Sequence, residues 1–332
     1  MRHCIQNLVW IVLLSITLGG CLSDDADVAD PNQALFEEQQ QTIEQFLQDQ
    51  DIATQQTATG IHYRVITENA DGIDPSPGNV AKLYYHIEQL DGTLIAEQDS
   101  SMGDPVTYTF AYSSPNPNRF HLTLPVGLDG MVGLMREGEV YEFFLPSGAA
   151  YLDYELPNVI PTNAIVRARI LLDRVLTVAQ QQAVEDQKIK DYLATESLTG
   201  FDSLTSGVYY ATTQVGDTSV QVAPTSAVGV RYTGSLLNGT VFDTNTGADD
   251  NLYEFSETVR RPIEGFLVGV QQMSLGEKGT ILIPSHAAYG EGVFAIPQSF
   301  VKDLKLLEER DRFNTIPPYA ILRFDVEVVE IK

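Results

Sequence analysis

Apolar and polar residues alternate through long parts of the chain, with the period of two that is typical of β-strands. The β-rich runs include VGVRYTGSL, TILIPS and AILRFDVEVVEI. LDG at residues 90–92 and LNG at residues 237–239 supply turn residues for hairpins. Helical patterns occupy residues 125–135 and 262–273, each with a proline at its start, where the first turn needs no N–H. The pattern predicts an α+β fold of curved antiparallel sheets, each crossed by one short α-helix.

Two polar segments precede the β-rich regions, and their apolar residues recur at helical spacing. The two stripes are Leu35, Phe36, Ile43, Phe46 and Leu47, and then Ile189, Tyr192 and Leu193. Most such stripes are packing faces, so we assign them to docking or spacing of domains and not to catalysis. The Gln- and Asp-rich flanks are typical of a solvated linker.

The chain contains one internal duplication. The motif M-x2-G-E-x5-(L/I)-P-S-x-A-A-Y runs from Met135 to Tyr151 and again from Met273 to Tyr289. Only two copies are present and the repeat is about 150 residues long, which indicates two globular domains and not a solenoid. The predicted divisions are a signal peptide at 1–20, an acidic linker and helix at 21–59, a first domain at 60–178, a linker helix at 179–200 and a second domain at 201–332.

The N-terminus is typical of a signal for export. A basic Arg2 precedes an apolar run that is too short to span a bilayer, and LGGC at residues 18–21 resembles a bacterial lipoprotein cleavage box. We therefore expect lipid on Cys21 to tether the protein to a membrane of the bacterial cell envelope, outside the cytoplasm. Leu22 after Cys21 favours the outer membrane. The alternative is an ordinary signal peptide that carries a chance cysteine.

Composition and charge exclude several classes of function. The 332 residues include 45 acidic and 20 basic side chains, a formal net charge of −25 that repels nucleic acids. Two cysteines cannot form a disulfide framework or a thiolate metal site. Residues 243–254 imitate a calcium-binding loop, but Ala248 stands where that loop needs glycine. We expect no metal and no cofactor.

The second copy resembles the FKBP-type peptidyl-prolyl cis-trans isomerases. The matching stretches are VRYTGSLLNGTVFDTN, RPIEGFLVGVQQMSLGEKGTILIPSHAAYGEG and IPPYAILRFDVEVVEI, which cover most of residues 225–332. The first copy looks like a diverged relative over about residues 75–176. The resemblance implies two FKBP-like domains and an apolar, aromatic-lined pocket that accepts proline and the peptide bond before it.

The resemblance also implies the site residues. It assigns catalytic roles to the side chains of Asp243 and Tyr289 and to the backbone N–H of Ile263. The implied pocket residues are Tyr232, Phe242, Phe255, Phe266, Ile316 and Phe324. Phe266 stands under the proline ring, where the family often has tryptophan. Taken singly, Phe255 and Phe324 could equally be ordinary core residues of a sheet.

The first copy departs from this pattern. Ile95 and Ala96 replace the Phe-Asp pair, Leu128 replaces the aromatic floor and Ala168 replaces the phenylalanine at 324. Pro125 occupies the position of Ile263 and has no N–H to donate. We expect this domain to be non-catalytic and to serve binding, spacing or stability.

An insertion at residues 291–315 departs from the family in the second copy. Its sequence has the pattern of an amphipathic helix, which would select protein clients, shade the pocket or simply add a surface helix. The expected function is isomerisation of proline-containing segments in exported client proteins. The alternatives are a non-catalytic binding or chaperone module, and a structural part of an envelope secretion or motility assembly. Oligomeric state has no marker in the sequence.

Overall fold

The computed structural model describes residues 31–110, 125–153, 155, 159–247, 252–256, 259–291 and 316–332. The predicted signal peptide, Cys21 and residues 292–315 of the insertion lie outside the described residues. The four α-helices of the described part are α1 (Pro31–Asp49), α2 (Leu128–Val132), α3 (Val178–Thr195) and α4 (Glu264–Val270). Among these residues, no helix has both the length and the apolar character needed to cross a membrane.

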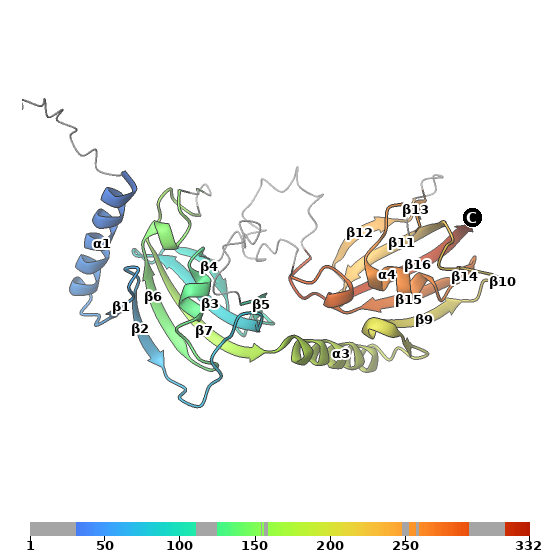
Figure 1. Ribbon diagram of the computed structural model, residues 1–332, viewed down its shortest axis with the longest axis horizontal. Coiled ribbons are helices and arrows are strands. Elements are labelled where there is room, and N and C mark those ends of the chain that lie inside the picture. Colours follow the sequence, from blue (N-terminus) through green and yellow to red (C-terminus); the bar gives the residue numbers. More distant parts are fainter. Residues whose placement is uncertain are drawn as a thin grey trace, which may run out of the picture.

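The first copy folds into a seven-stranded antiparallel sheet (Figure 1). Its strands are β1 (Gln55–Gln56), β2 (His62–Thr67), β3 (Val80–Gln89), β4 (Leu94–Gln98), β5 (Val106–Thr109), β6 (Val140–Leu145) and β7 (Val166–Leu176). Their spatial order is β1-β2-β6-β7-β3-β4, and β5 also pairs with β3. The short turn η1 (Ser147–Ala149) follows β6.

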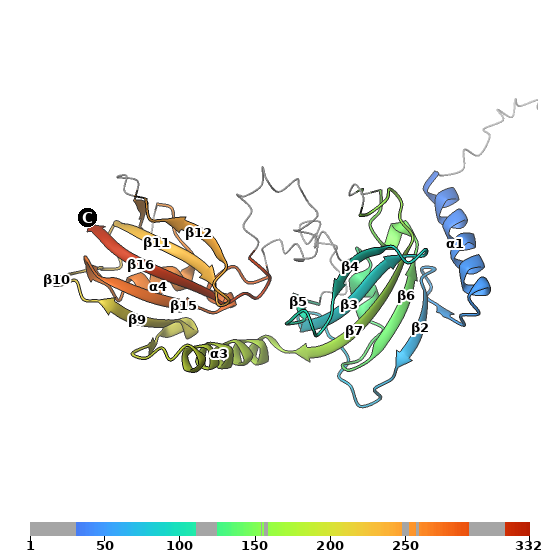
Figure 2. The same cartoon turned by 180° about the vertical axis from the view of Figure 1, so that it is seen from behind.

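The second copy repeats this order strand for strand, as both sides of the molecule show (Figures 1 and 2). Its sheet comprises β8 (Asp202–Ser203), β9 (Tyr209–Gln214), β11 (Val228–Leu236), β12 (Val241–Asn245), β13 (Tyr253–Phe255), β15 (Lys278–Ile283) and β16 (Leu322–Ile331). The order is β12-β11-β16-β15-β9-β8, with β13 on β11. Two further strands, β10 (Asp217–Gln221) and β14 (Ser274–Leu275), form a separate pair, and the turns are η2 (Thr205–Gly207) and η3 (Ser285–Ala287).

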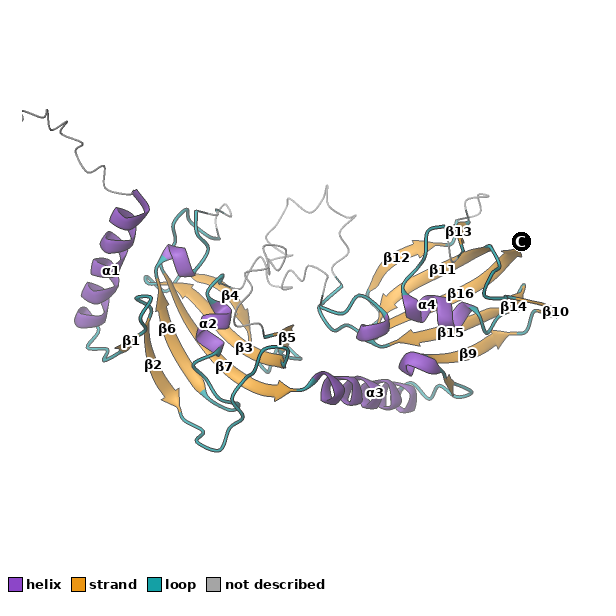
Figure 3. Cartoon of the chain, viewed as in Figure 1, coloured by secondary structure: helices purple, strands orange, loops and turns teal. Residues whose placement is uncertain are grey.

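The short helices lie across the sheets as predicted but are shorter than the sequence pattern (Figure 3). The prolines that we expected in the first turn stand before it. Ile263 is the N-cap of α4 with extended angles, φ −57° and ψ 148°, and Gly127 is the N-cap of α2. Each helix packs over a core of alternating strand residues, so that Leu128 and Phe266 are both almost fully buried.

Helix α1 covers the first sheet and helix α3 the second, each on the face that points away from the main core. Phe144 and Leu282 point away from the main cores because side chains alternate along a strand, and each meets a buried isoleucine of a helix. In the first copy this isoleucine is Ile43, and in the second it is Ile189. Of the roles considered for the helical stripes, packing onto a sheet is therefore what the contacts show. Each helix joins the sheet that follows it in the chain.

Candidate functional site

An aromatic cluster fills the space between α4 and the β11, β12, β13 and β16 side of the second sheet. It contains Tyr232, Phe242, Tyr253, Phe255, Phe266 and Phe324. Phe266 lies at its centre: its ring centroid is 5.0 Å from that of Phe324, 5.8 Å from Phe255 and 5.9 Å from Tyr232. All three contacts are edge-to-face, with interplanar angles of 69–77°, which is a favoured geometry for aromatic pairs.

Gly234 makes room for two of these rings. A Cβ at this position would lie 2.7 Å from the ring of Phe242 and 2.9 Å from that of Phe324. In the sheet, Gly234 pairs with Phe324 on one side and Asp243 on the other, and the register shifts just after it. This bulge leaves Phe242 buried and Asp243 exposed at adjacent positions.

Asp243 forms the polar edge of the cluster with Tyr232. The Tyr232 hydroxyl donates to Asp243 Oδ2 at 2.5 Å. Burial raises the pKa of Tyr232, and the bond to Asp243 together with the carboxylate charge raises it further. The phenol therefore stays protonated at neutral pH and remains a donor.

Tyr289 follows η3 and is 44% exposed, in contrast to the buried phenylalanines. Partial burial raises the pKa of Tyr289, and so do the nearby charge of Asp243 and the proximity of Tyr253. Its hydroxyl stays protonated at neutral pH and can donate a hydrogen bond to a ligand. The structure brings these two predicted catalytic side chains to the same side of the cluster.

Ile263 lies at the start of α4 and packs against the cluster. Its carbonyl accepts from the N–H groups of Phe266 and Leu267, at 3.1 and 3.2 Å. Among the described residues its own N–H has no hydrogen-bond acceptor. Ile316 is 7% exposed and belongs to the same core. All nine site residues predicted in the second copy thus belong to this core or to its edge.

The sequence reasoning missed Tyr253. Its ring lies 5.6 Å from Tyr232 and 6.4 Å from Phe266, so it is a wall of the same cluster. The signal was present in the alternation of β13, where residues 253 and 255 share a face. Only Phe255 was predicted.

The equivalent tyrosine of the first copy is buried. Tyr151, the counterpart of Tyr289, is 5% exposed. The N–H groups of Val126 and Gly127 donate to the carbonyls of Ala150 and Ala149, at 2.8 and 2.9 Å, and so join the start of α2 to the turn before Tyr151.

Two substitutions exchange volume inside the first copy. Ile87 pairs with Ala168, at the positions that Gly234 and Phe324 occupy in the second copy. The large side chain of the pair is on β16 in the second copy, but on β3, the equivalent of β11, in the first. The first core is thus filled by aliphatic packing where the second has aromatic rings.

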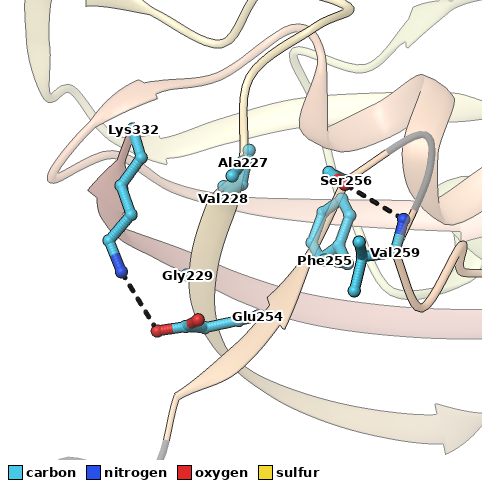
Figure 4. A pocket seen from close by; sticks show the side chains of 8 residues that line it. All are labelled: Ala227, Val228, Gly229, Glu254, Phe255, Ser256, Val259 and Lys332. Atoms are coloured by element: carbon cyan, nitrogen blue, oxygen red, sulfur yellow. Dashed lines mark hydrogen bonds and ion pairs between the residues drawn. The ribbon is translucent and has the colours of Figure 1, made fainter.

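A separate hollow of about 190 Å³ lies at the end of β11 and β13 (Figure 4). Its lining residues are Ala227, Val228, Gly229, Glu254, Phe255, Ser256, Val259 and Lys332. Lys332 and Glu254 form an ion pair of 3.2 Å across its rim. Of the predicted pocket residues it contains only Phe255, so it is not the predicted proline site. Within the described ranges, no three His, Cys, Asp or Glu side chains are grouped to hold a metal ion.

Known proteins place the chain in a family. The sequence model described as FKBP-type peptidyl-prolyl cis-trans isomerase matches residues 218–329. The FKBP-type 22 kDa peptidyl-prolyl cis-trans isomerase of Escherichia coli is 30% identical over 198 residues, which are 59% of this chain and 85% of that protein. Peptidyl-prolyl cis-trans isomerase FPR2 of Saccharomyces cerevisiae is 39% identical over 119 residues, 36% of this chain and 74% of that protein. FkpA of Aeromonas hydrophila is 33% identical over 156 residues, 46% of this chain and 50% of that protein. The chain belongs to the FKBP-type peptidyl-prolyl cis-trans isomerases.

Proposed function

We propose that the second copy carries the isomerase activity and that the first copy is non-catalytic. The observation that carries this proposal is the difference in exposure between the equivalent tyrosines of the two copies. Tyr289 is 44% exposed beside an aromatic cluster, whereas Tyr151 is 5% exposed after a turn that is bonded to the start of α2. Pro125 in the first copy also has no N–H at the position of Ile263.

The proposed mechanism requires no nucleophile. Rotation about an X-Pro bond is slow because amide resonance sets a barrier of about 18–20 kcal/mol. The site lowers this barrier if it binds the twisted amide better than either planar form. The proline ring packs against Phe266, and the aromatic walls remove water from the imide carbonyl. Because water bonded to that oxygen favours the planar form, its removal favours rotation.

Two donors orient the substrate in this scheme. The Ile263 N–H and the Tyr289 hydroxyl bind substrate carbonyls and hold the bond to be rotated over the aromatic floor. Asp243 keeps the Tyr232 hydroxyl in place at 2.5 Å and presents its remaining oxygen lone pairs to the substrate amide. Each 1.4 kcal/mol or so of extra binding to the twisted form gives about a tenfold faster rate.

The test is isomerisation of a short X-Pro peptide by the chain from residue 22 to 332, with Asp243→Ala and Tyr289→Phe. We expect acceleration that falls in both variants. The matched control is Tyr151→Phe in the first copy, which should leave the rate unchanged. If the folded chain does not accelerate isomerisation but still binds the peptide, the binding-module alternative holds and the catalytic proposal fails.

We further propose that lipid on Cys21 anchors the protein in the bacterial envelope, where exported proteins with slow X-Pro bonds are its clients. The support is the LGGC sequence at residues 18–21 and the acidic segment that follows it. Labelling of cells with a radioactive fatty acid should mark the wild-type chain and not Cys21→Ser. Equal labelling of both chains, or of neither, would contradict the anchor.

A further inference from the structure

A carboxyl group is buried between helix α3 and the second sheet. Glu185 is 2% exposed. Its two oxygens accept from the Ser285 N–H, the Ser285 hydroxyl and the Gln181 side-chain amide, each at 2.8 Å. A buried carboxyl is costly unless its hydrogen bonds are made, so these contacts fix both partners.

The serine that Glu185 holds organises the turn that carries Tyr289. The Ser285 carbonyl accepts from the N–H groups of Ala288 and Gly290, at 2.9 and 2.8 Å. These are the two neighbours of Tyr289 in the chain. Because the Tyr289 side chain is 44% exposed, little packing fixes it, and its position depends on this backbone.

The first copy contains the same device with a neutral side chain. Gln39 of α1 accepts through Oε1 from the N–H and hydroxyl of Ser147, at 2.8 and 3.0 Å. Gln39 and Glu185 each lie four residues before the buried isoleucine of their helix. The contact therefore belongs to the repeated unit. The acidic form, whose hydrogen bonds are stronger, occurs in the copy with the exposed tyrosine.

We infer that Glu185 is a positioning residue of the isomerase site, which acts through Ser285 to hold the turn that presents Tyr289. This inference rests on the proposed function of the second copy. It also makes α3, outside the matched family region at 218–329, a part of the active unit.

The test compares variants of the chain from residue 22 to 332. Glu185→Ala should lower kcat/KM for an X-Pro peptide about tenfold, because small displacements of orienting groups are costly to rate. Glu185→Gln reproduces the Gln39 contact and should recover most of the rate. The matched control is Gln39→Ala, which loosens the equivalent turn of the first copy and should leave the rate unchanged.

A cycle with Tyr289→Phe separates positioning from general damage. If Glu185 acts through Tyr289, Glu185→Ala should add little further loss when the hydroxyl is already absent. Amide hydrogen exchange should quicken at Ser285, Ala288 and Gly290 in Glu185→Ala and stay unchanged in β16. Should that variant not fold, Ser285→Ala loses only the hydroxyl contact and should show a smaller loss of the same kind.

The outcomes distinguish the two claims. A folded wild-type chain without activity overturns the proposed function. An active wild type whose Glu185→Ala variant is folded and keeps its rate overturns the inference alone. The inference also fails if the double variant loses kcat/KM by the full product of the two single losses, because the two residues then act independently.

Discussion

Several residues of the repeated motif stabilise turns and, within the described part of the chain, have no contact with the candidate site. Glu277 accepts from the Ser274 N–H at 2.9 Å, and its counterpart Glu139 accepts from the Arg136 N–H at 2.8 Å. The glycine before each glutamate has a positive φ, 83° at Gly138 and 76° at Gly276, which other residues adopt only with strain. The Gly-Glu pair thus closes a turn in both copies. Tyr289 is the member of the motif that reaches the site.

Gly234 is expected to be sensitive because two rings lie against its missing side chain. Gly234→Ala should destabilise the second domain by about 1–3 kcal/mol through overpacking and should also lower the isomerase rate. Urea unfolding and peptide isomerisation measure the two effects. The double variant with Phe324→Ala should lose less free energy of unfolding than the two single variants together. The reason is that it approaches the Ile87–Ala168 pair of the first copy. Simple additivity would contradict a shared packing site.

Two histidines of the first domain should respond to pH in opposite ways. Burial lowers the pKa of His86, but its contacts with Glu97 at 2.7 Å and Glu88 at 3.3 Å raise that pKa overall. Burial lowers the pKa of His62, and the charge of Glu44 opposes this only in part.

The sign of each stability effect follows from these shifts. For His86 the folded pKa is above the unfolded value, so its stabilising effect is complete below about pH 6.5 and is lost as pH rises through the folded pKa. For His62 the folded pKa is depressed, so stability falls as pH drops below about 6.5. Since the His86 side chain is 41% exposed, solvent limits its pair to about 0.2–1 kcal/mol. Urea unfolding between about pH 5 and 8 gives the slope of the free energy of unfolding against pH for the wild type, His86→Gln and His62→Gln. The two variants should depart from the wild-type slope in opposite directions. A departure in the same direction would contradict the assignment.

At the scale of elements, α3 is a part of the second domain. Ile189 is fully buried among Tyr209, Leu282 and Ile321, and Glu185 binds Ser285. The N-terminus of the helix is closed by a capping box between Thr177 and Gln180.

Two truncations test this role of α3. A chain that begins at Thr177 keeps the cap and should fold and isomerise peptide like the longer chain. A chain that begins at Phe201 exposes Leu282 and Ile321, each worth about 1.5–3 kcal/mol when fully buried. It should melt at a lower temperature and lose rate, as circular dichroism and the peptide assay would show. Equal behaviour of the two chains would contradict the packing role.

The strands and hairpins were predictable because they depend on local pattern. Alternation predicted which residues around Phe255 and Phe324 share a sheet face. Turn residues predicted the hairpins at 90–92 and 237–239. The resemblance supplied the site residues. The contact between Glu185 and Ser285 joins residues 100 positions apart, and no local pattern specifies it. The burial of Tyr151 was equally hidden, because the same A-A-Y sequence ends in the exposed Tyr289 in the second copy.

At the scale of the whole molecule, the net charge of −25 should favour basic clients. Long-range attraction speeds encounter and is screened by salt, with a Debye length of about 10 Å at 0.1 M. An X-Pro peptide flanked by lysines should show a kcat/KM that falls about two- to fivefold between low and high salt. The same peptide with alanine flanks is the control and should change little. A parallel response of both peptides would contradict steering by charge.

The attachment of α3 to the second sheet determines where the two halves of the molecule can turn. Strand β7 ends at Leu176 and α3 begins at Val178, so Thr177 is the single residue between them. The 18 residues of the helix form a stiff arm of about 27 Å that moves with the site. Two side-chain contacts also join the halves: the hydroxyls of Thr109 and Tyr319 share a hydrogen bond, and Lys188 pairs with Asp104 at 2.5 Å, an exposed ion pair that is weak in water. A turn of the chain at Thr177 would have to break the bond between Thr109 and Tyr319, and it would then carry α3 and the aromatic cluster as one body around the first domain.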